Sequence, residues 1–435
     1  MTAGRLLLAA VALAVLVGIA WLFSTARRQV VWRAVPAGVA LQIVFALLVL
    51  KVPAGRFVFD AVAGAFVQLL GFVNVGSQFV FGSLVDQSRF GFVLVVQVLP
   101  TIVFFASLTG VLYHLGVMQR VVKAMAWAVT KVMNVSGAEA TVVSASVFVG
   151  QTEAPLTVRP YIEGMTEAEL MTMMVGGMAH VAGSVMAAYV GLLGGDDADQ
   201  RRFYAKHLLA ASAMAAPATL LIAKILVPET GVPATRGTVA IEVERTTSNV
   251  IDAAAAGAAD GLRLALNVGA MLLAFVALIA LVNAPIHWLG AVSLGAGGAS
   301  IDGWLAAAAG HPVDLSLQTI LGAVMAPVAW LIGVPWHDAP LVGSFLGEKV
   351  VLNEFVAYVD LSQHLAALES QSRVVATYAL CGFANFASIA IQIGGIGGLA
   401  PGRRHDLARL GLRSVLGGTL ATLMTATIAG VIASP

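Results

Sequence analysis

The sequence has few charges and almost no cysteine for its length. Of 435 residues only 11% are charged, 59% are hydrophobic, and the mean hydropathy is +0.91. Soluble domains carry about 25% charged residues, so the chain is predicted to be an all-α polytopic membrane protein. The single cysteine, Cys381, excludes an intrachain disulfide and a cysteine-based metal cluster. A formal net charge of +1 gives no indication of a nucleic-acid partner.

Long apolar runs predict about eight membrane spans, because a spanning helix needs roughly 20 mainly apolar residues. The runs cover residues 5–23, 36–52, 91–115, 165–193, 204–227, 260–284, 373–397 and 407–431. Residues 54–86 mix apolar and polar residues more evenly and are predicted to lie in the membrane interface. Two further regions, 118–158 and 316–360, are interrupted by polar residues and proline, which indicates re-entrant helical hairpins. The arginine-rich loops 26–33 and 402–413 are predicted to be cytoplasmic, with the chain in the cell (inner) membrane.

A unit of one hairpin and two spans occurs twice. "AHVAG" at 179–183 and "ANFAS" at 384–388 both lie in mid-span, and each follows a hairpin that carries a glutamate. We therefore expect four parts: spans, an interfacial helix and a scaffold span in 1–117; the first repeat in 118–227; a connector, interfacial helix and scaffold span in 228–315; and the second repeat in 316–435. One crossing between the two units would make them an inverted repeat with broken helices at the membrane midplane.

The hairpin glutamates are the first candidates for a site. A charged side chain at the bilayer centre costs about 2.5–3.5 kcal/mol on insertion scales. Glu153 and Glu354 are therefore predicted to be functional, although each carboxylate alternatively caps its own hairpin helix. Gln151 and Thr152 precede Glu153 and extend the polar hairpin tip.

The broken spans supply the remaining candidates. Asn385 and Ser388 are three residues apart and share one helix face, where they either line a cavity or satisfy the free backbone groups of the break. Phe383 is either a core residue or a ligand contact. His180 is either a packing residue or a proton carrier, because an imidazole titrates near neutral pH.

Three segments match a known pattern: "GQTEAPLTVRPYI" at 150–162, "NEFVAYVDL" at 353–361 and "CGFANFASIAIQIGG" at 381–395. They resemble the signature segments of concentrative nucleoside transporters. The resemblance implies eight spans and two re-entrant hairpins per protomer, a homotrimer in the lipid bilayer, and nucleoside as substrate, without catalytic residues, a bound metal or a cofactor. It further implies that Gln151, Thr152 and Glu153 face the nucleobase, that Val185 and Phe383 give apolar contact, and that Glu354, Asn385 and Ser388 hold the ribose hydroxyls.

The sequence departs from the sodium-coupled members of that family at two positions. Those members have Asn at the position of Ser146 and a small hydroxyl residue at that of His180. Histidine is a poor ligand for a hard cation, so symport with H+ is predicted, with Na+ as the alternative. The ion-coupling candidates are His180, Ser146, Glu153 and Glu354. A passive nucleoside pore and, more remotely, a membrane hydrolase are the other function classes to test.

Overall fold

The computed structural model describes residues 3–91, 93–236, 247–293, 300–309 and 313–433. These residues form helices and turns, apart from two isolated β-bridges. In chain order the α-helices are α1 (Ala3–Leu22), α2 (Ala34–Leu50), α3 (Pro53–Phe81), α4 (Gln87–Phe90), α5 (Leu94–Gln97), α6 (Leu99–His114), α7 (Val117–Met133), α8 (Gly137–Ser146), α9 (Glu167–Ala179), α10 (Gly183–Gly194), α11 (Ala198–Leu226), α12 (Val250–Ala291), α13 (Ile301–Ala309), α14 (Leu317–Leu331), α15 (Ala339–Val351), α16 (Glu354–His364), α17 (Ser370–Leu380), α18 (Phe386–Leu399) and α19 (Arg404–Ile432). The 3₁₀ helices are η1 (Arg27–Gln29), η2 (Gly82–Val85), η3 (Ala154–Gly164), η4 (Leu365–Ala367) and η5 (Pro401–Arg403).

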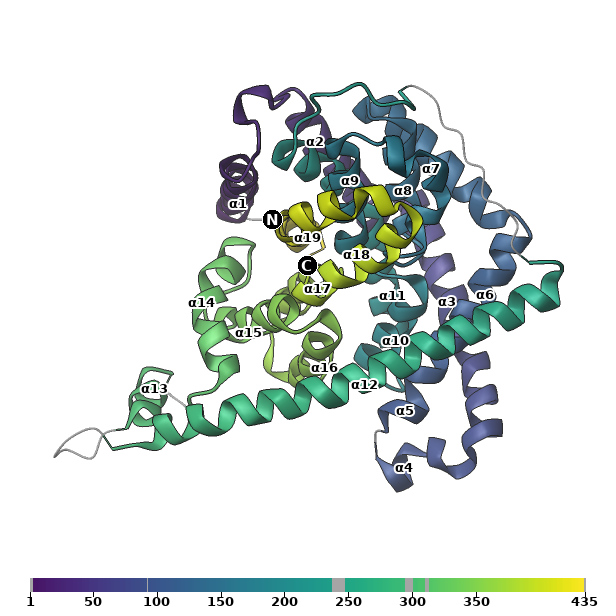
Figure 1. Ribbon diagram of the computed structural model, residues 1–435. Helices are drawn as coiled ribbons and strands as arrows, with labels where there is room; N and C mark the ends of the chain where they lie inside the picture. Colours follow the sequence, from purple (N-terminus) through teal and green to yellow (C-terminus); the bar gives the residue numbers. More distant parts are fainter. Residues whose placement is uncertain (1–2, 92, 237–246, 294–299, 310–312, 434–435) are drawn as a thin grey trace.

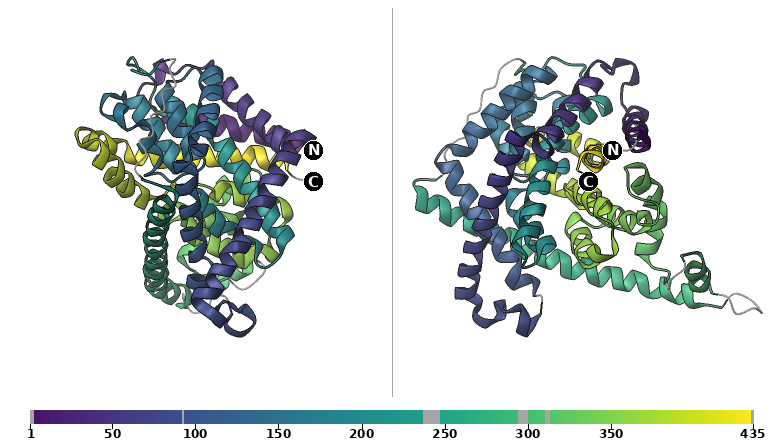
Figure 2. Two further views of the ribbon diagram at one scale, coloured as in Figure 1. Left: turned by 90° about the vertical axis from the view of Figure 1, so that its right-hand side faces the viewer. Right: turned by 180° about the vertical axis from the view of Figure 1, so that it is seen from behind.

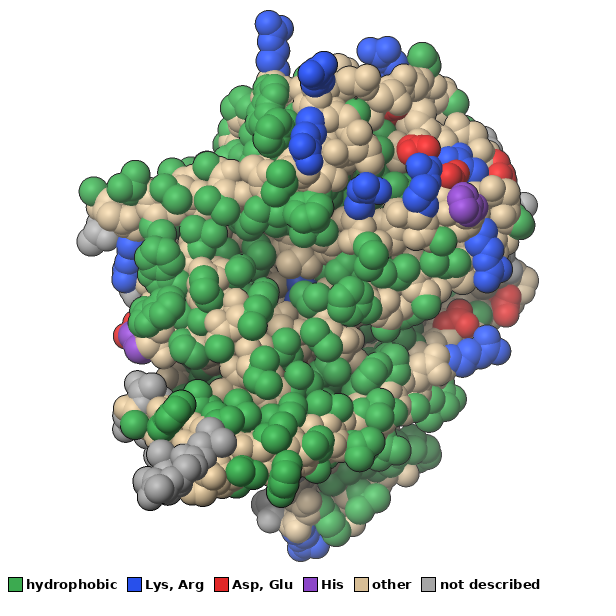
Figure 3. Space-filling view, turned by 60° about the vertical axis from the view of Figure 1, so that its left-hand side comes forward, with side chains coloured by type: hydrophobic (Ala, Val, Ile, Leu, Met, Phe, Trp, Pro, Cys, Tyr) green, Lys and Arg blue, Asp and Glu red, His purple; other side chains and the backbone are tan. Residues whose placement is uncertain are grey.

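Seven helical segments in the described part of the chain are long and apolar enough to cross a membrane, which agrees with the polytopic all-α prediction. They are Ala3–Leu22, Pro53–Val85, Leu94–His114, Glu167–Gly194, Ala198–Leu226, Val250–Ala291 and Pro401–Ile432. Glu167–Gly194, Ala198–Leu226 and Pro401–Ile432 are largely buried inside the protein, whereas at most a third of the most apolar stretch of each of the other four segments is buried. Figure 3 shows apolar side chains over most of one face of the molecule. Such a continuous apolar surface is suited to lipid.

The segment expected to lie in the membrane interface is one continuous helix in the structure. Residues 54–86 belong mostly to α3, a single helix of 29 residues that is apolar enough to span a membrane. One of its polar residues, Asp60, forms a 2.8 Å ion pair with Lys206 of α11. Ser77 is buried. Asp60 and Ser77 therefore face protein, whereas four other polar residues of α3 are exposed, so the placement of this helix in the membrane interface stays a prediction.

The helix after the connector is continuous. We predicted an interfacial helix and a scaffold span within 228–315, and in the structure α12 continues for 42 residues from Val250 to Ala291. Its first turn is capped by Asn249, and α12 packs along α6 through small residues. A Cβ on Gly257 would lie 2.6 Å from the carbonyl oxygen of Ala106, so the two backbones are in close contact. Residues 237–246 of the connector lie outside the described part.

The repeated unit is present in the helix order. The sequence α6, α7, α8, η3, α9, α10, α11 is matched by α12, α14, α15, α16, α17, α18, α19. Figure 1 shows α7 to α9 in the upper half of the molecule and α14 to α16 in the lower half. Figure 2 shows α12 along one edge, with α13 projecting beyond the remaining helices. Each hairpin is shorter than predicted: α7 and α14 are separate helices, and the hairpins themselves are α8 with η3 and α15 with α16.

Two helices are broken near the centre, as the polar and glycine-rich patterns predicted. The first break separates α9 from α10 at residues 180–182, and the second separates α17 from α18 at residues 381–385. Gly382 has a φ of +147°, and a Cβ there would lie 2.7 Å from the carbonyl oxygen of Met178. The second break therefore touches the end of α9, and only glycine fits at this contact.

Candidate functional site

One large cavity lies between the hairpin tips, the two breaks and the helices α6 and α12. Its volume is about 830 Å³, within the range of small-molecule sites. All eight residues predicted to bind substrate line it: Gln151, Thr152, Glu153, Val185, Glu354, Phe383, Asn385 and Ser388. Ser146 and His180 are not among its lining residues.

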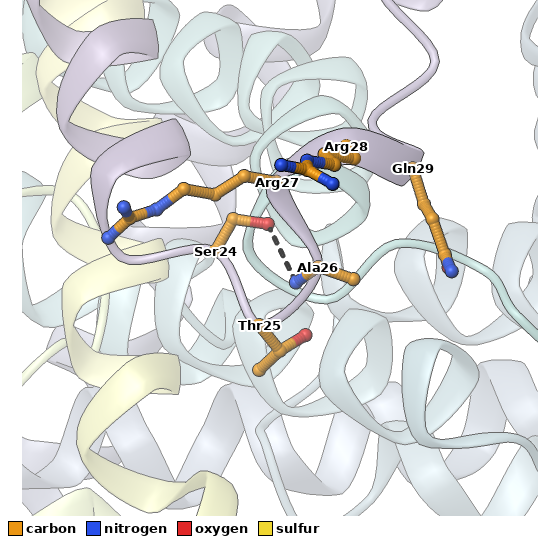
Figure 4. A pocket seen from close by; sticks show the side chains of 6 residues that line it. All are labelled: Ser24, Thr25, Ala26, Arg27, Arg28 and Gln29. Atoms are coloured by element: carbon orange, nitrogen blue, oxygen red, sulfur yellow. Dashed lines mark hydrogen bonds between the residues drawn. The ribbon is translucent and has the colours of Figure 1, made fainter.

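A second hollow is formed by one surface turn, Ser24 to Gln29, with a volume of about 420 Å³. In Figure 4 the side chains of Arg27 and Gln29 point away from each other, and the drawn hydrogen bond joins Ser24 to the backbone of Ala26. A hollow lined by a single short segment does not bring together residues from different elements, so we do not regard it as a site.

The carboxylate of Glu354 is the centre of one polar cluster in the large cavity. Asn353 caps α16 by accepting a hydrogen bond from Val356 N at 2.9 Å, and this cap places Glu354 as the first helical residue. The Glu354 side chain accepts hydrogen bonds from Tyr189 OH at 3.1 Å and from Asn385 Nδ2 at 2.9 Å. Asn385 in turn accepts from Ser388 N and caps α18. Both oxygens of this buried carboxylate are therefore oriented by fixed donors.

Gln151 is the centre of a second cluster, which joins the two repeats. Its Nε2 donates to Ser388 Oγ at 3.1 Å, and its Oε1 accepts from Gln392 Nε2 at 3.1 Å. Gln392 Nε2 also donates to the carbonyl of Met174 at 3.0 Å. The tip of the first hairpin is thus held by side chains of the second broken helix.

Glu153 occupies a different environment from Glu354, although the sequence pattern treats the two alike. Glu153 is exposed where it borders the cavity, and its carboxylate lies against Gly150 in the same tip. Tyr113 of α6 is near enough to interact with it electrostatically. Glu153 is therefore more available to a solute or to water than the enclosed Glu354.

The two residues proposed to mark the coupling ion lie together around Gly176. His180 Nδ1 is 2.7 Å from the carbonyl oxygen of Gly176, and a Cβ on Gly176 would lie 3.5 Å from Ser146 Oγ. Ser146 Oγ donates to Val142 O at 2.9 Å. His180 Nε2 is buried without a hydrogen-bond partner in the part of the chain that is described.

The structure also corrects one expected correspondence between the repeats. The matching of "AHVAG" with "ANFAS" placed His180 opposite Asn385. His180 instead ends α9 at its C-terminus, whereas Asn385 begins α18 at its N-terminus. The two breaks have three and five residues. An ungapped alignment of the two segments therefore cannot match both the helix end before the break and the helix start after it.

Sequence reasoning missed two polar residues of the site, Tyr189 and Gln392, and the capping role of Asn353. Gln392 is four residues after Ser388, and this spacing would have placed both on one helix face. Asn353 precedes the first residue of a helix, which is a typical capping position. Nothing in the residues around Tyr189 indicates its contact with Glu354.

Gly177 gives a test of the second cluster. A Cβ at this position would lie 2.7 Å from Gln392 Nε2 and 2.8 Å from Gln151 Cβ. Gly177→Ala is therefore expected to displace the glutamine pair and weaken binding of the nucleoside that the family resemblance implies, with an overpacking cost of about 1–3 kcal/mol. Calorimetric binding of uridine measures the effect. The control is Gly191→Ala, because a Cβ on Gly191 meets no atom within 4 Å; equal binding by both variants would contradict the role of the glutamine pair.

Comparison with known proteins gives a consistent result over almost the whole chain. Three family models match: "Na+ dependent nucleoside transporter C-terminus" over residues 207–430, "Na+ dependent nucleoside transporter N-terminus" over 11–84, and the "Nucleoside recognition" gate over 95–196. An uncharacterized transporter of Haemophilus influenzae is 46% identical over 96% of this chain and 95% of its own length. The nucleoside permease NupC of Helicobacter pylori is 38% identical over 98% and 97%. The structure of CNTnw in an inward-facing substrate-bound state has a TM-score of 0.86 at 43% identity and covers 99% of both chains.

Proposed function

The chain belongs to the concentrative nucleoside transporter family, a family of transporters and not of enzymes, and we propose on this basis that it imports nucleosides by secondary active symport. The observation that carries the proposal is the cavity of about 830 Å³ into which both hairpin tips and both helix breaks bring polar side chains. Such discontinuous helices at a repeat interface are the usual binding sites of secondary transporters.

The Glu354 cluster is suited to the ribose. A carboxylate accepts two hydrogen bonds from a vicinal diol, and Tyr189 and Asn385 already hold its two oxygens in fixed directions. We assign Glu354, Asn385 and Ser388 to the ribose hydroxyls. A free base cannot form the hydrogen bonds assigned to the sugar, so uracil is expected to compete with uridine much more weakly than a second nucleoside does.

The other half of the cavity is suited to the nucleobase. The amide of Gln151 offers a donor and an acceptor, and Thr152 and Glu153 lie beside it on the first hairpin tip. Val185 and Phe383 add apolar surface to the same cavity. We therefore assign Gln151, Thr152 and Glu153 to the base edge, directly or through water, and the two apolar side chains to its faces.

We propose Na+ as the coupling ion, in place of the H+ that the sequence favoured. The matched family descriptions name sodium. Carbonyl oxygens at the C-terminal ends of half-helices coordinate such ions without a particular side chain, and α8 and α9 both end beside Ser146 and His180. A proton on His180 is the second candidate, favoured by the unpaired buried Nε2 of this residue.

The remaining parts of the proposal concern assembly and location. We infer a homotrimer in the cell (inner) membrane in which 118–227 and 316–435 form the moving, substrate-binding repeats. Residues 1–117 and 228–315 then supply the scaffold. The close contact of α6 with α12 through Gly257 and Gly261 is consistent with a rigid scaffold pair.

Uptake of labelled uridine into proteoliposomes tests the function and the ion together. An inward Na+ gradient at constant pH and membrane potential is expected to drive accumulation above the equilibrium level. A pH gradient without sodium should then have no effect in the wild type. Accumulation driven by the pH gradient alone, and lost in His180→Ala, would replace sodium by the proton; equilibration without accumulation would indicate a passive pore.

A further inference from the structure

Lys349 is a fully buried lysine at the C-terminal end of α15, next to the second hairpin tip. Only 1% of the residue is exposed. Its Nζ donates to the carbonyl oxygen of Ala379 at 2.8 Å and to Thr422 Oγ1 at 3.0 Å. An ammonium group is costly to bury unless it is paired, and here it lies at the C-terminal turn of α17, where the helix dipole favours a cation.

The carbonyl group that accepts from Lys349 has a counterpart in the first repeat, beside the proposed ion-coupling residues Ser146 and His180. Gly176 and Ala379 each lie nine residues after the first residue of their half-helix, Glu167 and Ser370. The carbonyl of Gly176 accepts from His180, and the carbonyl of Ala379 accepts from Lys349.

The neighbouring helices match as well. Ser146 is the last residue of α8, and Lys349 lies in the last turn of α15. A Cβ on Gly176 would lie 3.8 Å from the methyl group of Thr219 on α11, and Thr422 on α19 is the corresponding hydroxyl residue beside Ala379. Hairpin, half-helix and last helix therefore meet in the same way in both repeats.

The two positions differ in whether their polar atoms are satisfied. In the first repeat, Thr219 Oγ1 and His180 Nε2 are buried without partners among the described residues. In the second repeat, the carbonyl of Ala379 and the hydroxyl of Thr422 both contact the ammonium of Lys349. The first position thus has unused polar atoms, and the second is filled.

We propose that Lys349 is a tethered cation. Its ammonium occupies, in the second repeat, the position that corresponds to the ion-coupling position of the first repeat, so that the transported ion binds in the first repeat alone. This inference rests on the proposed symport function. Lys349 is a positioning residue: it holds the end of α17, from which the chain continues directly into the break with Phe383 and Asn385, and it interacts electrostatically with Glu354.

Two substitutions separate the charge of Lys349 from its bulk. Lys349→Ala removes the ammonium and leaves space for a small cation. Lys349→Met removes the charge but fills the space with a chain of similar length. Purified protein is studied in choline, Na+ and n-propylammonium, with thermal unfolding measured without nucleoside and uridine binding measured by calorimetry.

In choline, Lys349→Ala is expected to unfold at a lower temperature than the wild type, because a charge-assisted hydrogen bond is lost. Its affinity for uridine should be lower by roughly tenfold or more. Propylammonium or Na+ should restore the unfolding temperature and the uridine affinity of Lys349→Ala. Neither cation should restore them in Lys349→Met. The wild type should show only the response to Na+ that its own coupling site produces. A purely structural lysine would not be replaced by a soluble cation.

Two results would overturn the proposal: wild-type behaviour of Lys349→Ala in choline, or the same cation response in both variants. If neither variant folds in choline, purification is repeated in propylammonium; recovery of Lys349→Ala alone supports the tethered cation, and recovery of neither contradicts it. Absence of uridine binding in the wild type would instead refute the nucleoside function. Thermal unfolding of the two variants in the three cations would still test whether Lys349 acts as a tethered cation.

Discussion

Glu354→Gln is expected to weaken nucleoside binding by roughly ten- to a hundredfold, because a hydrogen bond to a charged group contributes about 1.5–3 kcal/mol. The wild-type carboxylate is held by Tyr189 OH at 3.1 Å and by Asn385 Nδ2 at 2.9 Å. An amide keeps only one acceptor oxygen and directs an NH2 group toward one of these donors. Both the ligand contact and the geometry of the pocket are then lost.

Calorimetric titration with uridine measures this effect. Glu163→Gln is a matched control, because Glu163 lies outside the cavity and its side-chain Oε1 accepts from Gly402 N, a contact that glutamine can retain. The control should bind uridine as the wild type does. Near-normal affinity in Glu354→Gln, with intact folding, would remove Glu354 from the ribose site.

Lys224→Met is expected to cause the largest loss of stability, about 3–5 kcal/mol, because it leaves a buried charge unpaired. Glu139 in α8 is 1% exposed and forms a 2.6 Å ion pair with Lys224 of α11. Thr172 of α9 donates to the same carboxylate at 2.8 Å. Without Lys224, the Thr172 hydroxyl and the backbone N–H of Ser136 remain as donors to this carboxylate, and no cation faces it among the described residues.

The double variant Glu139→Gln with Lys224→Met is the control, since it removes both charges. It should recover most of the lost stability in thermal or denaturant unfolding of the detergent-solubilised protein. The stability changes caused by substitutions at two contacting residues are expected not to add. If the double variant loses as much unfolding free energy as Glu139→Gln and Lys224→Met lose in sum, the ion pair is not the source of the effect.

The sequence predicted the features that depend on local pattern. Polar and proline interruptions in apolar segments located both hairpins, and glycine with polar residues in mid-span located both helix breaks. The family resemblance identified eight residues that line one cavity. These predictions succeeded because membrane-embedded backbone tolerates irregular structure only where protein or a cavity satisfies it.

Tertiary contacts account for what the sequence did not reveal. The mixed composition of residues 54–86 did not indicate that Asp60 forms an ion pair with Lys206 on another helix. Glu153 and Glu354 have equivalent places in the pattern, yet the residues that enclose Glu354 come from α10 and the second break. Neither pairing has a fixed spacing along the chain, so no window of sequence contains it.

The bonds between Gln151, Ser388 and Gln392 have a consequence for the half of the transport cycle in which no cargo is present. A carrier that performs net uptake must return without substrate. A buried polar group without a hydrogen-bond partner costs about 1–3 kcal/mol, so such a group would slow the return of the empty carrier. In this protein both polar atoms of the Gln151 amide bond to side chains of the second broken helix, Ser388 and Gln392. Net uptake, rather than one-for-one exchange of nucleosides across the bilayer, is the behaviour that such internal pairing favours.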